Sequence, residues 1–341
     1  MQEITGGLSG DAEKDLVYLQ EKCEEYKDHE LGKEIVRACG RLIYDLLPED
    51  AKEEIGQATE NDLEGIRAAL EEVKFNIYKK DYDKALALIE PLVRRIEEGQ
   101  LYQDDLVSEY RRFDEFYEEL LYRFIYKPEK TLRRAELPYT VIYSLYGSLL
   151  VEMKRLEEAR TALEKGLRWN PMHFGMMSEY METYKMQGDM DEFFRLTVQA
   201  FKIAIHRPQL ARCYRNLGYY FIEKELYPEA KACYFMSLHY EPDSKQASSE
   251  LYAIHMATDG KLPDPTAKDL GRYSVQYGFP LGPDENTYSV GCNYGKYFME
   301  QGNKEAALYC FKISYELTYD EDVKKIIDLL EEKKDTDSSG N

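Results

Sequence analysis

Long apolar runs and paired cysteines are both missing from this 341-residue chain. No stretch approaches the ~20 apolar residues that cross a bilayer, and the first residues lack the basic and hydrophobic segments of a signal peptide. The six cysteines form no Cys-x-x-Cys pair, which favours reduced cysteines packed in a protein core. These absences predict a cytoplasmic protein that has no membrane partner.

Positive charge is also in short supply. Lys and Arg number 45 against 65 Asp and Glu, so the formal net charge is −20. Non-specific nucleic-acid binding depends on neutralising phosphates, and adsorption to anionic membranes depends on basic side chains. The balance argues against both kinds of partner and predicts a solvated acidic exterior.

Motifs that mark catalysis or metal binding are absent from the sequence. It contains no Gly-rich phosphate loop, no His-Glu-x-x-His and no Gly-x-Ser-x-Gly. The five histidines are scattered, with no pair spaced to hold a metal on one helix face. The sequence therefore predicts a protein that is not an enzyme and needs no cofactor or metal.

What the chain does contain is a repeated pair of helices, clearest between residues 211 and 242. The first helix carries an aromatic residue, Leu-Gly and a second aromatic; the second carries a small residue, an aromatic, another small residue and a closing proline. These residues are Tyr214, Leu217, Gly218, Phe221, Ala230, Tyr234, Ser237 and Pro242. Gly218 and Ala230 are small enough to let two antiparallel helices approach while aromatic rings fill the space beside them.

Two further stretches repeat this pattern, starting at Thr140 and near Tyr288, and residues 174–207 keep the helical rhythm without the small residues. The matching residues are Tyr143, Tyr146, Gly147, Leu150, Ala159, Leu163, Gly166 and Pro171, and then Tyr294, Gly295, Phe298, Ala307, Phe311 and Ser314. The pattern resembles the tetratricopeptide repeat (TPR) over roughly the last two-thirds of the chain. This resemblance implies an all-α fold: a right-handed TPR-like solenoid of helical hairpins, with an N-terminal helical cap and a C-terminal capping helix.

Composition and spacing divide the chain into successive segments. They are an N-terminal helical cap (1–58), degenerate TPR-like helices (59–138), a TPR array (139–257), an interrupting loop–helix–loop (258–287), a final TPR-like pair with its capping helix (288–335) and a disordered tail (336–341). The interrupting segment is interpreted as an eroded repeat with a longer connection, with a functional insert as the alternative.

Several boundaries follow from capping residues and apolar spacing. Asn61 or Asp62 is expected to cap a helix, and residues 103–126 are expected to form one long helix. A short helix or bend should follow up to Pro138. Asp243 is expected to cap a further helix, and Thr266 with Asp269 should form a capping box.

The candidate site lies on the first helix of the best repeat. A second stripe, about 200° from the buried one, holds Arg212, Arg215, Asn216 and Tyr219. In TPR proteins this stripe lines a concave groove that binds peptides, so the resemblance implies that these side chains face a partner. Arginine and asparagine side chains suit carboxylate, phosphate or peptide-backbone groups. The equivalent positions elsewhere include Glu179, Glu182, Lys185, Ser144 and Ser148.

A structural role for the arginines is the competing interpretation. Arg212 and Arg215 would then pair with Glu179 and Glu182 of the preceding helix and staple the array. If Arg215 instead binds a partner, Arg215→Glu should weaken binding while the melting temperature stays unchanged. The sequence also departs from the TPR clamp for acidic C-terminal peptides, because Ser144, Ser148 and Glu179 occupy three of its places.

Three functions fit these features. The first is a non-catalytic scaffold that binds a partner protein or peptide in the groove. The second is an architectural subunit that self-associates into a homo-oligomer. The third is a peptide-sensing regulator of the kind TPR arrays form in Gram-positive bacteria, although residues 11–58 are short and acidic for the N-terminal domain of such proteins.

Overall fold

The computed structural model describes residues 1–99 and 102–338. The regular secondary structure of the described residues is α-helical apart from two short strands and one 3₁₀ turn. Its backbone divides into two compact units. Unit 1 comprises residues 1–113 and 128–170, and unit 2 comprises residues 114–127 and 171–341.

Unit 1 begins with a short helix and a helical hairpin. Its helices are α1 (Gln2–Gly6), α2 (Ala12–Tyr26), α3 (Gly32–Leu46), α4 (Glu49–Tyr78), α5 (Tyr82–Gly99), α7 (Tyr139–Glu152) and α8 (Leu156–Trp169). Apolar residues at helical spacing on α2 and α3, including Leu19, Ile35 and Cys39, form the core of the N-terminal hairpin. The predicted helices in this region are therefore confirmed.

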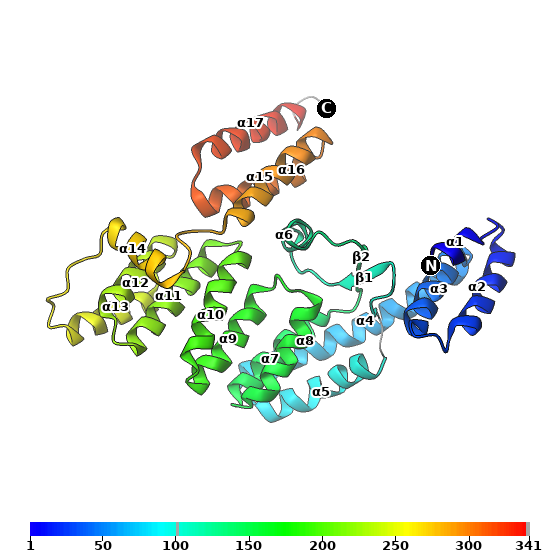
Figure 1. Ribbon diagram of the computed structural model, residues 1–341, viewed down its shortest axis with the longest axis horizontal. Helices are drawn as coiled ribbons and strands as arrows, with labels where there is room; N and C mark the ends of the chain where they lie inside the picture. Colours follow the sequence, from blue (N-terminus) through cyan, green and yellow to red (C-terminus); the bar gives the residue numbers. More distant parts are fainter. Residues whose placement is uncertain (100–101, 339–341) are drawn as a thin grey trace. The chain divides into compact units, whose positions relative to one another are not determined.

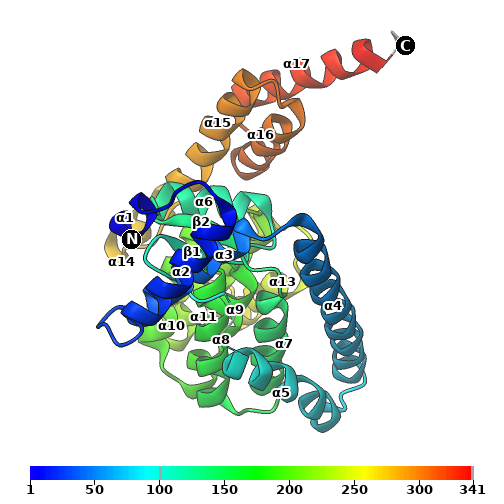
Figure 2. The same ribbon diagram turned by 90° about the vertical axis from the view of Figure 1, so that its right-hand side faces the viewer.

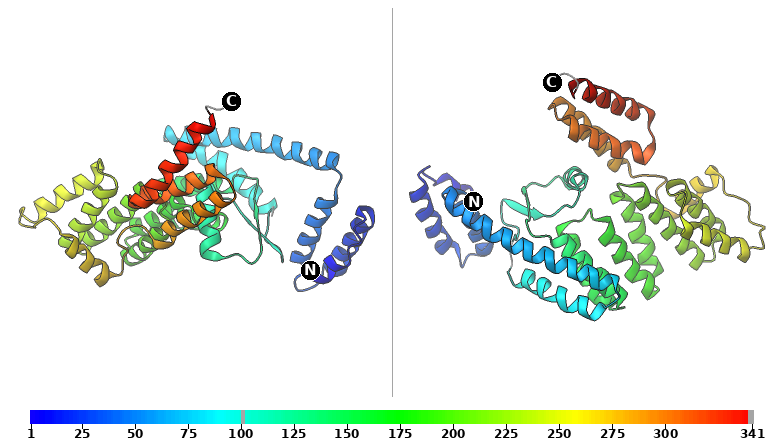
Figure 3. Two further views of the ribbon diagram at one scale, coloured as in Figure 1. Left: turned by 90° about the horizontal axis from the view of Figure 1, so that it is seen from above. Right: turned by 180° about the vertical axis from the view of Figure 1, so that it is seen from behind.

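The helix expected to start at Asn61 or Asp62 begins earlier. Pro48 occupies the N-cap position of α4, which runs without a break to Tyr78 and lies alongside α5 (Figure 3). A proline is well tolerated at a helix start because its missing N–H group is not needed there. Pro91 lies inside α5.

The single long helix predicted over 103–126 is wrong. Residues Ser108–Arg111 form strand β1, which pairs in parallel with strand β2 (Thr131–Arg134). Asp105 Oδ1 accepts hydrogen bonds from the backbone N–H groups of Val107 and Ser108, each at 2.8 Å. This local capture of amides competes with helix formation and turns the chain into the strand.

Unit 2 contains the remaining elements, of which α9 to α13 stand side by side in Figure 1. They are α6 (Phe116–Tyr126), α9 (Phe174–Gln187), α10 (Met190–Ala200), η1 (Phe201–Ile203), α11 (Arg207–Glu223), α12 (Tyr227–Tyr240), α13 (Lys245–Ala257), α14 (Ala267–Tyr277), α15 (Glu285–Glu300), α16 (Lys304–Thr318) and α17 (Glu321–Ser338). Helix α10 packs between α9 and α11, and α12 packs between α11 and α13. The aromatic core includes Phe193, Tyr214, Phe221 and Tyr234, all at most 2% exposed.

Helix α6 joins unit 2 although the strands on either side of it belong to unit 1. It packs on α15, where the Tyr117 hydroxyl donates a 2.5 Å hydrogen bond to the carbonyl oxygen of Thr287. Gly291 makes this approach possible, because a Cβ atom there would lie 2.7 Å from the Tyr117 hydroxyl.

Two histidines hold the start of α6. His173 and His206 occupy the N-cap positions of α9 and α11. His173 Nε2 lies 3.3 Å from Asp114 Oδ2, and His206 Nε2 lies 3.0 Å from Glu115 Oε2. The hydrogen bond to Glu115 raises the pKa of His206 above its usual value, and the same bond lowers the pKa of Glu115.

The interrupting segment is a helix between two irregular stretches, as predicted. The Thr266–Asp269 capping box opens α14, with both reciprocal hydrogen bonds formed. The second irregular stretch is anchored by Tyr214, whose hydroxyl donates to the Pro280 carbonyl at 3.2 Å and accepts from the Gly282 amide at 2.7 Å. This stretch is therefore packed against the repeat.

The C-terminal helices α15, α16 and α17 follow one another as a packed group (Figure 2). Arg207 links the end of this group to the preceding repeat: it donates to the carbonyl oxygens of Glu316 and His239 and lies over the rings of Tyr240 and Tyr319. Helix α17 extends to Ser338, so residues 336–338 of the expected tail are helical. Residues 339–341 of that tail lie outside the described residues.

One capping prediction needs correction. Ser244, not Asp243, caps α13, and its side chain accepts from the Ala247 amide. Within residues 1–99 and 102–338, no helix has both the length and the apolarity to span a bilayer.

Candidate functional site

Arg215 is engaged within its own repeat. Its Nη1 atom donates to Glu241 Oε2 at 2.5 Å, to Ser237 Oγ at 3.2 Å and to Ser244 Oγ at 3.4 Å. These partners belong to α12, the residue after it and the N-cap of α13. Arg215 therefore fastens three successive helices together, and its ion-pair partner is Glu241, not the Glu179 or Glu182 expected from the stapling interpretation.

Arg212 and Asn216 lie one helical turn apart on α11, and their contacts differ from those of Arg215. Both are partly buried, and neither side chain has a hydrogen bond or ion pair with any residue in 1–99 or 102–338. A guanidinium group and a carboxamide at this spacing point from neighbouring positions of one helix face. Together they offer donors that the protein itself leaves unused.

Tyr219, the next residue of the stripe, contacts helix α9. Lys185 Nζ lies 4.5 Å from the centre of the Tyr219 ring and 3.2 Å from Glu182 Oε1. Burial, followed by the negative charge of Glu223, raises the pKa of Tyr219. The structure thus brings Glu182, Lys185 and Tyr219 together across helices α9 and α11.

Three hairpins close in the same way, and this decides their type. A Cβ atom on Gly147 would lie 2.4 Å from Leu163, one on Gly218 would lie 2.6 Å from Tyr234, and one on Gly295 would lie 2.7 Å from Phe311. In each hairpin the large side chain follows the glycine at the same interval (147 to 163, 218 to 234, 295 to 311). These contacts resemble those of TPR hairpins. The predicted resemblance and the helical-hairpin fold are therefore confirmed, apart from the two strands.

Comparison with known proteins adds two distant structures. No family model and no curated protein matches the chain. A tetratricopeptide repeat protein from Parabacteroides merdae shares 13% identity, with a TM-score of 0.37 over 94% of this chain and 93% of that one. The APC/C hetero-tetramer Cut9–Hcn1 also shares 13% identity, with a TM-score of 0.34 over 95% of this chain and 61% of that one. The hairpin contacts above, and not these two structures, carry the resemblance to TPR proteins.

The other predicted site residues fall into two places. Glu179 lies on α9 of unit 2, whereas Ser144 and Ser148 lie on α7, the first helix of the TPR hairpin in unit 1. Ser144 and Ser148 are half-buried and one turn apart. The stripe predicted from the sequence is therefore distributed over both units, and only its α9 and α11 members form one described surface.

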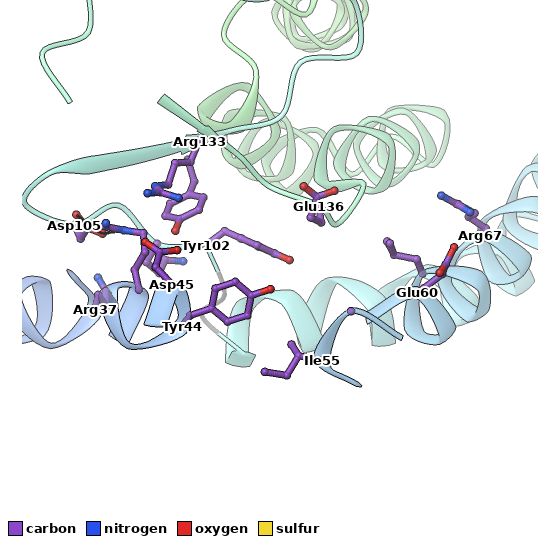
Figure 4. A pocket seen from close by; sticks show the side chains of 15 residues that line it. Arg37, Tyr44, Asp45, Ile55, Glu60, Arg67, Tyr102, Asp105, Arg133 and Glu136 are labelled. Atoms are coloured by element: carbon purple, nitrogen blue, oxygen red, sulfur yellow. Dashed lines mark hydrogen bonds and ion pairs between the residues drawn. The ribbon is translucent and has the colours of Figure 1, made fainter. Parts of the chain in front are cut away.

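A cavity of about 750 Å³ in unit 1 was not predicted from the sequence. Helices α3 and α4 line one side, and the residues before β1, β2 and the residues just after it line the other (Figure 4). Inside it, Arg41 forms an ion pair with Asp105, with Nη2 3.0 Å from Oδ2. Arg133 Nε donates to Ser108 Oγ at 3.1 Å. These residues converge from distant parts of the sequence, so no local motif announces the cavity.

The described residues contain no cluster of three or more His, Cys, Asp or Glu side chains arranged to hold a metal ion. Several acidic side chains of the helical hairpins form ion pairs along helices or between hairpins, as Asp191 does with Lys224. The surface of α9 and α11 and the cavity of unit 1 can both form hydrogen bonds and ion pairs with a bound molecule.

Proposed function

We propose that this protein is a cytoplasmic, non-catalytic TPR scaffold that binds a partner peptide across helices α9 and α11. The observation that carries the proposal is the pair Arg212 and Asn216, which present unused donors on the first helix of the most regular repeat. All six cysteines are unpaired, which fits a reducing compartment.

The chemistry of the surface defines the partner. Arg212 suits a carboxylate, and Asn216 suits a backbone amide, which it can engage as donor and acceptor. The Tyr219 ring, held between Lys185 and Phe193, adds a flat apolar contact beside them. An extended peptide with an acidic side chain or a free C-terminus satisfies all three groups.

Arg215 has a different part in this proposal. The Arg215 guanidinium donates to Glu241, Ser237 and Ser244, so Arg215 holds α11 in place. The residues of α11 that bind the peptide are then Arg212 and Asn216. Glu182 and Lys185 satisfy each other and set the charge of the adjoining edge. The binding determinants are therefore narrower than the full stripe.

The test is a selection from a library of random peptides with free C-terminal carboxylates, followed by fluorescence polarisation on the selected peptides. Arg212→Ala and Asn216→Ala are expected to weaken binding, Arg212→Ala by about tenfold or more, because a charge-assisted hydrogen bond is lost. Lys224→Ala is the matched control, since this exposed residue of the same helical hairpin pairs with Asp191. Selected peptides that bind Arg212→Ala and wild type equally would contradict the proposal, as would a selection that enriches nothing.

A further inference from the structure

The cavity of unit 1 holds one buried ion pair that is already complete. Arg41 is 11% exposed and Asp105 is 2% exposed, and Asp105 accepts from both Nε and Nη2 of Arg41 as well as from two backbone amides. A carboxylate so fully hydrogen-bonded has little capacity left. Both residues line the cavity, and because Arg41 is already paired with Asp105 it is not a free cation.

Among the described residues, Arg133 is one of two cations that the cavity leaves available; the other is Arg67 on α4, which lies beside Glu60 (Figure 4). The Nε atom of Arg133 is committed to Ser108, but its two terminal nitrogens have no acceptor among residues 1–99 and 102–338. The guanidinium is half-buried in strand β2 and points into the cavity (Figure 4). A guanidinium group that is hydrogen-bonded at Nε and unpaired at its two terminal nitrogens is suited to bind a carboxylate in a bidentate way.

Carboxylates line the same space. Glu136 follows β2, and Glu60 lies on α4, with both side chains exposed and without a partner in the described part of the chain. Glu136 lies close to Tyr102: burial, followed by the charge of Glu136, raises the pKa of that phenol. The cavity is therefore lined by cations, Arg133 and Arg67, and by carboxylates, Glu136, Glu60 and Asp45.

Apolar and aromatic side chains line the cavity between these charged groups. Tyr44 on α3 and Ile55 on α4 are 42% and 45% exposed, which is high for such side chains, and both line the cavity with Tyr102 and Leu63. In Figure 4, Tyr44 and Ile55 lie across the space from Arg133 and Glu136. Side chains of this kind provide the apolar contact area of small-molecule sites, whose volumes run from about 300 to 1,000 Å³.

We infer that this cavity binds a zwitterion, a free amino acid or a short unblocked peptide. Its carboxylate would pair with Arg133, its ammonium group with Glu136 or Glu60, and its side chain would pack on Tyr44 and Tyr102. A simple anion meets the repulsion of Glu136, Glu60 and Asp45, and a simple cation meets the repulsion of Arg133 and Arg67. A molecule with both charges can pair with a cation and with a carboxylate of the cavity, and this site is separate from the peptide surface proposed on α9 and α11.

The test is a thermal-shift screen of the full chain against the standard free amino acids and a set of unblocked dipeptides. Each ligand is run beside its N-acetylated, C-amidated form, and acetate and inorganic phosphate are run as simple anions. A bound ligand stabilises the native state, so at least one zwitterion should raise the melting temperature by several degrees. Titration calorimetry then gives its affinity for the variants.

Arg133→Gln is expected to weaken binding of that ligand at least tenfold, and Glu136→Gln to weaken it less because Glu60 stays in place. Ser108→Ala removes the same Arg133–Ser108 hydrogen bond but keeps the charge, so it separates a structural defect from lost recognition. Lys74→Gln, on α4 and paired with Glu71 outside the cavity, should bind normally. The inference is overturned if no zwitterion shifts melting, if blocked forms or acetate shift it equally, or if Arg133→Gln binds as wild type does.

Discussion

Replacing Arg215 by methionine should destabilise unit 2, although the sequence places this residue on the partner-facing stripe. The substitution keeps most of the side-chain volume and removes the guanidinium that joins α11 to Glu241, Ser237 and Ser244. Glu241 is 39% exposed, so solvent screens the ion pair and its loss costs about 1 kcal/mol. Ser237 is fully buried, and loss of its donor adds about 1 kcal/mol.

The expected total is a loss of about 2 kcal/mol in the free energy of unfolding, or about 4–8 °C in melting temperature for a unit of this size. Circular dichroism during urea and thermal unfolding measures this loss. The only tryptophan, Trp169, lies in unit 1, so its fluorescence follows that unit directly and shows whether the damage is confined to unit 2.

Two comparisons make the reasoning refutable. Arg212→Met, one turn away and without a described partner, should change stability by less than about 0.5 kcal/mol. A double-mutant cycle of Arg215→Met with Glu241→Gln should show a coupling of about 1 kcal/mol, because the two residues share one ion pair. Equal stability of Arg215→Met and wild type, or zero coupling with Glu241, would show that the contact contributes nothing.

Two further predictions concern packing and pH. Gly218→Ala should lower the free energy of unfolding in urea by about 1–3 kcal/mol, because the added Cβ would lie 2.6 Å from the buried Tyr234 ring. The control is Gly65→Ala, which should not destabilise the protein because the space around Gly65 is open. The His206–Glu115 contact should stabilise unit 2 most between pH 4.5 and 6.5. The pKa of His206 is raised from 6.5, so the contribution of His206 to stability is lost as pH rises through its pKa in the folded protein. The pKa of Glu115 is lowered from 4.5, so the contribution of Glu115 is lost as pH falls through its pKa in the folded protein. Unfolding free energies of wild type and His206→Gln at about pH 5.5 and 8.5 should differ more at the lower pH, by less than about 1 kcal/mol; a difference independent of pH contradicts this.

The sequence predicted the regular hairpins well because their determinants are local. Gly218 and Tyr234 belong to one hairpin, and the intervals that place them opposite each other are visible in the chain itself. The capping box of Thr266 and Asp269 is equally local. In both places, residues close together in the chain determine the backbone.

The region from 103 to 126 was mispredicted because its apolar spacing also fits a helix. What decides its structure is Asp105, which captures two nearby amides, and the pairing of Ser108–Arg111 with Thr131–Arg134. Parallel pairing joins residues that the chain separates by a whole helix, and apolar periodicity carries no information about it.

The sequence predicted which residues share one face of α11, but not the contacts that their side chains make. Helical spacing correctly put Arg212, Arg215 and Asn216 on one side of α11. It could not show that Arg215 reaches Glu241 and Ser244 on following helices, because side-chain pairing depends on how hairpins stack. The convergence of Arg41, Asp105 and Arg133 in unit 1 is likewise a product of tertiary structure.

The route of the chain through α6 affects how this protein can be synthesised and dissected. Ribosomes complete α6 long before α15, so the nascent protein carries the apolar side chains of Tyr117 and Leu121 with their eventual partner helix still untranslated. Cutting the gene once, after Asn170, would likewise deprive unit 2 of this helix and leave Gly291 facing an empty slot. A fragment that reproduces unit 2 has to carry residues 114–127 on a new linker.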